Sequence, residues 1–188
     1  MFSDLFETIH PAYFFLSALL FMLGIYCGPL AVDREIGFLL RYPRWIHYLL
    51  ERYFKPYFGF WLTFTIIFIL NNLSLFSSFV SGFLVVVPPL AAFLTGFNVA
   101  VISYELLGWQ GIGQIFINPV AWLEFPAAWI SFSLGFVLAE AQLAGESAGA
   151  IWPQLWPLYL KYVGFILLLA ALLETGMIEL ARKYEKKD

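Results

Sequence analysis

Apolar residues fall in long runs along this chain, and polar residues gather between the runs. A helix needs roughly 20 apolar residues to cross the hydrocarbon of a bilayer, and its backbone groups must be satisfied within the helix itself. Five runs approach that length, at 12–32, 57–76, 79–104, 120–143 and 156–180. The pattern predicts an all-α, polytopic membrane bundle with about five transmembrane helices, and residues 1–188 are expected to form a single integral membrane domain.

Two features qualify these spans. The pair Pro88-Pro89 interrupts the third run and is expected to break it, which leaves open an interpretation in which 57–104 is one re-entrant element instead of two spans. The segment RYPRWIHYLLERYFK, between the first two runs, alternates basic and aromatic residues. That pattern is typical of a helix lying in the membrane interface, so we expect an amphipathic interfacial segment there.

Basic residues predict the orientation. They gather in the first connection and in the C-terminal tail, while the connections near 72–78 and 144–155 have none. Because cytoplasmic loops are enriched in Lys and Arg, five spans with the N-terminus outside and the C-terminus in the cytoplasm account for both clusters. The basic residues of the two clusters are Arg34, Arg41, Arg44, Arg52 and Lys55, then Arg182, Lys183, Lys186 and Lys187.

Composition supports the membrane class. Hydrophobic residues make up 62% of the chain and charged residues 12%, whereas a soluble domain is about half apolar and a quarter charged. Lipid is therefore the expected partner of much of the surface, and we expect a multi-pass protein of the plasma membrane. The juxtamembrane arginines are explained by anionic lipid, so no nucleic-acid partner is expected.

Small residues recur at helix-packing intervals in three of the spans. Helices in lipid approach one another closely through such residues, so these positions are predicted to line helix–helix contacts. They also favour association with further copies of the chain or with other membrane proteins. The positions are Gly24, Gly28, Ala92, Gly96, Ala100 and Gly135.

One carboxylate stands inside the apolar stretch NPVAWLEFPAAWISF. A charge in mid-bilayer costs from about 3 to more than 10 kcal/mol, so Glu124 needs a particular environment. Helical spacing from Glu124 meets small and polar residues, so it is expected to face the interior of the bundle. Asn118 is a good N-cap and Pro119 suits the first helical position, which places Glu124 near the favourable end of the helix dipole.

The polar residues expected to accompany this carboxylate come from three spans. Asn71 and Asn72 are expected to end the second span, and Asn98 lies within the third. Two interpretations stay open: Glu124, charged or protonated, holds the helices in register through hydrogen bonds, or it binds a ligand or a proton. The predicted intramembrane polar site is Glu124, Asn98, Asn71, Asn72 and Ser131.

Sequence motifs of known catalytic chemistry are absent. The chain has no HExxH, no GxSxG and no Walker sequence, and neither histidine lies within a span. The Gly-rich stretch GWQGIG lacks the spacing of a dinucleotide-binding loop and is expected to be a turn. We therefore expect no enzyme activity, no catalytic residues, no cofactor and no metal ion.

Three short motifs carry a family resemblance. Asn71-Asn72 is followed by Gly82, Gly96-Phe97-Asn98 comes next, and Pro119 precedes Glu124-Phe125-Pro126. Over roughly residues 57–180 the chain resembles the stage II sporulation protein M family, small polytopic membrane proteins of bacteria and archaea. That family often has Pro-His-Gly-x-x-Glu at the third motif. Here Val and Ala take the places of His and Gly, so no role of that histidine carries over.

The resemblance implies a helical bundle without known catalysis. In spore formers, the namesake protein is a membrane anchor that gathers peptidoglycan-degrading partners. The first functional hypothesis is thus an integral membrane scaffold or subunit of a membrane complex, expected to form homo-oligomers or to bind other membrane proteins. The alternative is a small-solute or ion transporter or channel that uses Glu124 with nearby Asn residues.

Overall fold

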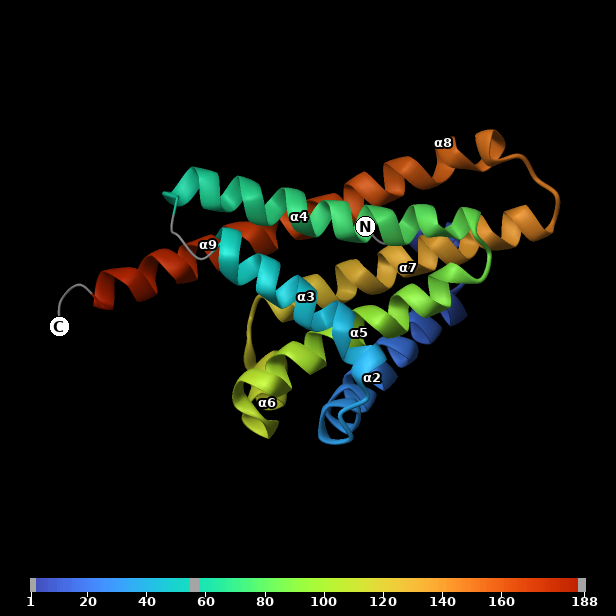
Figure 1. Ribbon diagram of the computed structural model, residues 1–188. Helices are drawn as coiled ribbons and strands as arrows, with labels where there is room; N and C mark the ends of the chain where they lie inside the picture. The colour runs from blue at the N-terminus through green and yellow to red at the C-terminus, as the bar shows by residue number, and fades with distance from the viewer. Residues whose placement is uncertain (1–2, 55–57, 186–188) are drawn as a thin grey trace.

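The computed structural model describes residues 3–54 and 58–185, and the described chain is helical nearly throughout (Figure 1). Five helical segments are long and apolar enough to cross a membrane, which confirms the all-helical class and the number of candidate spans. These segments are Pro11–Asp33, Phe60–Phe83, Val87–Leu107, Ala121–Leu143 and Gly149–Tyr184. The shorter helices are α1 (Ser3–Thr8), α3 (Gly37–Phe54) and α6 (Trp109–Ile117).

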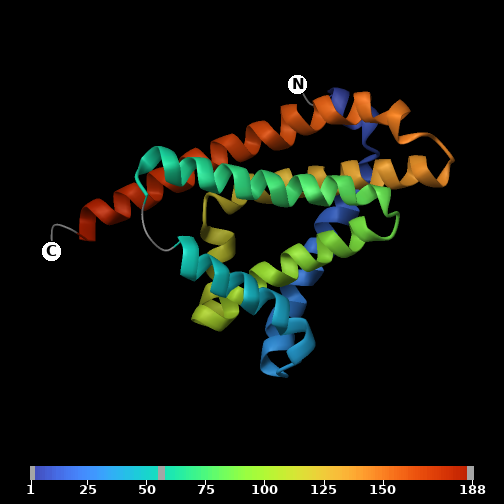
Figure 2. The same ribbon diagram turned by 45° about the horizontal axis from the view of Figure 1, so that its top comes forward.

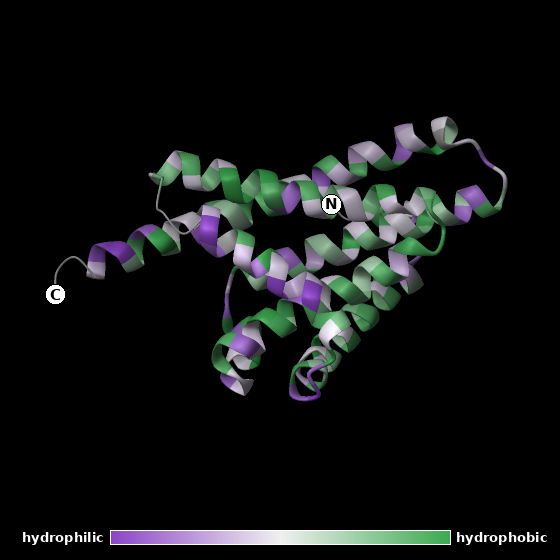
Figure 3. Cartoon of the chain, viewed as in Figure 1, coloured by the Kyte–Doolittle hydropathy of each residue, from purple (hydrophilic) through white to green (hydrophobic). Residues whose placement is uncertain are grey.

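Helix α7 (Ala121–Leu143) forms the centre of the bundle. It contacts α2 (Pro11–Asp33), α4 (Phe60–Val80), α5 (Val87–Leu107) and α9 (Phe165–Glu185), and it is the most buried of the five spans. Figure 2 shows α4 beside α7, with the red C-terminal helix crossing over them. Hydrophobic positions follow the long helices, whereas hydrophilic positions gather on α3, in the connection after α7 and at the end of α9 (Figure 3).

Helices α2 and α5 pack together through the small residues noted in the sequence. A Cβ on Gly24 would lie 2.1 Å from the Phe93 carbonyl oxygen, and a Cβ on Gly96 would lie 2.0 Å from the Phe21 carbonyl oxygen. Only glycine permits backbones to approach this closely. Residues later in α2 contact residues later in α5, so the two helices run parallel. This is the direction required of the first and third spans of one bundle.

The remaining small residues follow the same principle. Gly28 of α2 packs on Ala100 of α5, and Ala92 is fully buried. Gly135 of α7 lies against α4, where its Cβ would meet the Ser78 carbonyl oxygen at 3.1 Å. These packing faces are therefore filled by other helices of the same chain.

The expectation that Asn71 and Asn72 end a span was wrong. Helix α4 continues to Val80 and is extended by a 3₁₀ turn, η1 (Ser81–Phe83), so both asparagines lie in mid-helix. Past the asparagines the helix also includes Ser77 and Ser78, whose hydroxyls donate to the carbonyls of Leu73 and Ser74 one turn earlier.

The proline pair begins a helix and does not break one. Pro88 and Pro89 lie in the first turn of α5, where a missing backbone N–H removes no helical hydrogen bond. A turn at 84–86 separates this helix from η1. Residues 57–104 are consequently two helices, α4 and α5, in the described part of the chain, and the structure gives no support to a re-entrant element.

The last span is longer than the apolar run at 156–180. Helix α8 (Ala148–Leu158) continues through a π-helical turn, η2 (Tyr159–Gly164), into α9. Pro153 and Pro157 lie inside α8 and cannot donate helical hydrogen bonds, and the wider π turn follows them directly.

The connection after the first span and the connection after the third span are both helical. The segment between the first two spans forms α3, where Phe38, Tyr42 and Trp45 are exposed and Arg44 pairs with Glu105 at 2.7 Å. Its position in the membrane interface stays a prediction. Lys55, Lys186 and Lys187, on which the predicted orientation partly rests, lie outside the described residues.

The stretch GWQGIG is a helix, so its prediction as a turn was wrong. It opens α6, and Gly111 lets α6 fold back tightly on α5, since a Cβ there would lie 2.0 Å from the Ser103 carbonyl oxygen. Sequence spacing showed no sign of this close approach.

Candidate functional site

Glu124 lies in the first turn of α7, half-buried among the helices. The Asn71 side-chain amide of α4 donates a hydrogen bond of 2.6 Å to its carboxylate. Among the described residues, this amide is the single hydrogen-bond donor to the Glu124 carboxylate. Pro126 follows two residues later and cannot donate to the Trp122 carbonyl, so a backbone acceptor beside the carboxylate has no helical partner.

The residue that caps the start of α7 is Val120, two residues after the expected cap, Asn118. The helix begins at Ala121, after Asn118 and Pro119. Asn118 still stabilises the chain before the helix, because its side-chain oxygen accepts a hydrogen bond of 3.0 Å from the Val120 backbone N–H. Glu124 remains in the first turn, where the helix dipole favours negative charge.

The other predicted polar residues are distributed around this centre. Asn72 donates to the Phe68 carbonyl of its own helix, while its backbone oxygen accepts a hydrogen bond of 3.1 Å from Tyr159 Oη. Ser131 donates to the Leu75 carbonyl at 2.6 Å. Asn72 and Ser131 therefore tie η2 and α7 to α4 and do not contact the Glu124 carboxylate.

Two cavities have Glu124 among their lining residues. An inner cavity of about 190 Å³ lies between α2, α4, α5, α7 and α9, and an outer cavity of about 570 Å³ lies between α5, α6, α7 and α9. Val99, Glu124 and Phe125 line both of them. Glu124 thus lies on the wall of an outer space near α6 and also of an inner space within the bundle.

The inner cavity has polar groups from three helices. Asn71 and Ser74 of α4, Thr95 of α5 and Glu124 of α7 line it together with apolar residues. Asn98, predicted as part of the site, is not among its lining residues; one turn of α5 presents Thr95 and Val99 instead. Hydroxyl, amide and carboxylate oxygens of this kind suit small hard cations and hydrogen-bonding solutes.

A second carboxylate from α9 was missed at the sequence level. Glu174, half-buried, lies close enough to Glu124 for the two side chains to interact electrostatically. Its helical neighbours on the same face, Ala170 and Ala171, are fully buried, and that small-residue spacing was the signal that it points inward.

On the far side of the inner cavity, the helices are tightly packed. Ser17 of α2 and Ser133 of α7 are fully buried with their hydroxyl oxygens 3.3 Å apart. A Cβ on Gly82 would lie 2.4 Å from the Gly135 carbonyl oxygen. At the α6 end, the outer cavity is lined in part by exposed residues, among them Ile117 and Asn118.

A comparison of the chain with protein-family models, with curated proteins and with solved structures found no match. The resemblance to the stage II sporulation protein M family therefore stays a prediction. In the part of the chain that the structure describes, no group of three or more His, Cys, Asp or Glu residues is arranged to hold a metal ion.

Proposed function

We propose that this protein is a small-solute or ion transporter or channel of the membrane that binds a small cation, or a solute with hydrogen-bond donors, at Glu124. The observation that carries the proposal is the position of the Glu124 carboxylate on the wall of both cavities. A solute passing from the outer to the inner cavity would have to pass this side chain and its partner Asn71.

Charge favours a cationic solute. The carboxylates of Glu124 and Glu174 repel each other, and a bound cation or proton would offset that repulsion. Asn71 uses its amide N–H to hold Glu124, which leaves the side-chain oxygens of Asn71, Ser74 and Thr95 as acceptors around the inner cavity.

The scaffold hypothesis rested on the family resemblance, on the absence of catalytic motifs and on small-residue faces that would bind further copies of the chain. The small-residue faces do not support it, because Gly24, Gly28, Gly96 and Gly135 contact other helices of the same chain. We therefore place solute binding ahead of a scaffold role.

Thermal unfolding of the detergent-purified protein tests the proposal. The unfolding midpoint is measured with Na⁺, K⁺, Mg²⁺ and methylammonium, for the wild type, for Glu124→Gln and for Glu140→Gln. The last is a matched control, because Glu140 is an exposed glutamate near the other end of the same helix, where it accepts a hydrogen bond from Tyr13. A ligand at 100 times its dissociation constant stabilises the folded state by about 2.7 kcal/mol.

We expect one cation to raise the midpoint of the wild type and of Glu140→Gln, and to leave Glu124→Gln unchanged. The same cation should then cross proteoliposome membranes that contain wild-type protein and not those that contain Glu124→Gln. If every cation acts equally on all three proteins, Glu124 is not a binding residue and the proposal fails.

A further inference from the structure

The outer cavity at Glu124 is much larger than a bare metal ion requires. Its volume is about 570 Å³, within the range of about 300–1,000 Å³ that is typical of pockets for small organic ligands. A water molecule, by comparison, takes up about 30 Å³ of liquid. The outer cavity therefore has room for a solute with a carbon skeleton.

Most of the lining of the outer cavity is apolar. Its apolar side chains come from four helices, and among them are Leu106, Leu107, Ile115, Phe125 and Met177. The polar side chains among the described lining residues are Ser103, Gln114, Asn118 and Glu124, of which Glu124 alone can carry a charge. One carboxylate in a mainly apolar pocket suits an amphipathic solute, with a positive charge at one end and hydrocarbon at the other.

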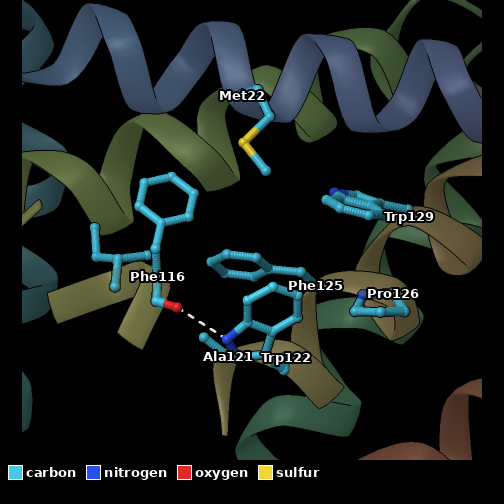
Figure 4. A pocket seen from close by; sticks show the side chains of 8 residues that line it. Met22, Phe116, Ala121, Trp122, Phe125, Pro126 and Trp129 are labelled. Atoms are coloured by element: carbon cyan, nitrogen blue, oxygen red, sulfur yellow. Dashed lines mark hydrogen bonds between the residues drawn. The ribbon is translucent and has the colours of Figure 1, made fainter. Parts of the chain in front are cut away.

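The wall beside Glu124 is apolar on both of its sides. Three residues of the outer cavity also line a neighbouring apolar cavity of about 190 Å³ between α2, α6 and α7: Ile115, Ala121 and Phe125. Phe125 directly follows Glu124 on α7. Figure 4 shows Phe125 in the middle of this apolar lining, and its ring centroid lies 6.4 Å from that of Phe116 and 6.3 Å from that of Trp129. A hydrocarbon group against this wall would meet aromatic and aliphatic surface.

The charge of the site favours an ammonium group at the other end of the solute. The Glu124 carboxylate accepts a hydrogen bond from Asn71, and Glu174 is close enough to interact with it electrostatically. An ammonium group offers up to three N–H donors to carboxylate oxygens, and an aromatic ring such as that of Phe125 attracts positive charge over its face. Within the described ranges, no group of three or more His, Cys, Asp or Glu residues is arranged to hold a metal ion. An ammonium group therefore fits these residues better than a bare metal ion.

We infer that the solute bound at Glu124 is an amphipathic amine. Its protonated amino group donates to the Glu124 carboxylate, and its alkyl chain or single ring lies against Phe125 in the outer cavity. The inference rests on the proposed function, because it names the class of cation that the same site takes. Each methylene group that is buried strengthens binding about fourfold, so the affinity should rise with the size of the apolar part.

A series of amines tests the inference on the detergent-purified protein. Methylammonium, butylammonium and 2-phenylethylammonium share the cationic group and differ in the apolar part, whereas 2-phenylethanol has the ring without the charge. Each dissociation constant is obtained from the shift of the thermal unfolding midpoint across a concentration series. Butylammonium has three more methylene groups than methylammonium and should bind the wild type at least about tenfold more tightly. Detergent takes up the larger probes, so each probe is also compared between variants in the same detergent.

Two variants separate the apolar contact from the charge. Met177→Ala shortens a side chain of the outer cavity and should weaken butylammonium and 2-phenylethylammonium about fivefold, while methylammonium is unchanged. Leu169→Ala is the matched control, because Leu169 lies on the same helix, is 40% exposed against 41% for Met177, and is outside the lining. Glu124→Gln should abolish binding of all three amines and leave 2-phenylethanol unchanged.

The inference is supported by an affinity that rises with the apolar part, depends on Glu124 and falls in Met177→Ala. It is overturned if methylammonium binds as tightly as the longer amines, if 2-phenylethanol matches 2-phenylethylammonium, or if Met177→Ala behaves as Leu169→Ala does. In the first of these cases, cation binding at Glu124 still stands. If Glu124→Gln alters the binding of no amine and no inorganic cation, the proposed function fails together with the inference.

Discussion

Replacing Gly96 with alanine tests the packing on which the whole bundle depends. The added Cβ would lie 2.0 Å from the Phe21 carbonyl oxygen, whereas ordinary van der Waals contact begins at 3.4 Å. The two backbones would have to separate locally by about 1.4 Å, because neither partner is the flexible end of a side chain. A gap of even 0.5–1 Å forfeits roughly a quarter to a half of each dispersion contact.

Overpacking of this kind costs typically about 1–3 kcal/mol, and we expect Gly96→Ala to lie at the upper end, near 3 kcal/mol. The free energy of unfolding is measured in detergent by denaturant or thermal titration. Gly176→Ala is the matched control: Gly176 also lies within a long helix, α9, and a Cβ there meets nothing within 4 Å. Alanine favours a helix by about 0.5–1 kcal/mol over glycine, so the control should be neutral or slightly stabilising.

If Gly96→Ala is no less stable than Gly176→Ala, the close parallel packing of α2 and α5 is wrong. A Gly96→Ala protein that unfolds normally but changes its oligomeric state would mean that this face contacts another copy. Size-exclusion chromatography with light scattering separates that result from destabilisation of the monomer.

Two further predictions follow from the polar contacts and the charge pattern. Asn71→Ala should lower the free energy of unfolding by about 1–2 kcal/mol, because Glu124 loses its donor, whereas Asn72→Ala removes only an intrahelical bond and should cost less than about 0.5 kcal/mol. Equal losses in the two variants would contradict the Asn71–Glu124 contact. In a cysteine-free background, Glu146→Cys should react with a membrane-impermeant thiol reagent on intact cells, and Glu35→Cys only after permeabilisation, since the basic residues of the first connection predict that this connection lies in the cytoplasm. The reverse labelling pattern would invert the predicted topology.

The helical class and the number of candidate spans could be predicted because both depend on local pattern. Run length and apolar content determine whether a helix can cross lipid, and they do not require knowledge of any neighbour. Helical spacing likewise indicated that Glu124 points inward, since the face it shares with Ala127 and Ser131 is small and polar; both of these neighbours are buried.

Helix ends were less predictable where polar residues have more than one use. Serine and asparagine occur at caps and also within helices, bonded to the preceding turn, and only the surrounding packing decides between the two. The local sequence is compatible with a helix that ends at Asn71 and with one that continues, and with a proline that breaks a helix or begins one. In the structure α4 continues through Ser77 and Ser78, and α5 begins with Pro88 in its first turn.

The identity of the site's neighbours was decided by tertiary structure. Asn71 and Glu124 are 53 residues apart, and nothing in the local pattern chooses Asn71 over Asn98 as the donor. Helical spacing could indicate that Glu174 points inward, but its position near Glu124 depends on how α7 and α9 pack together. Local sequence determined that this chain forms apolar helices with one inward carboxylate, whereas the close approach of glycine backbones decided which helices meet and where cavities remain between them.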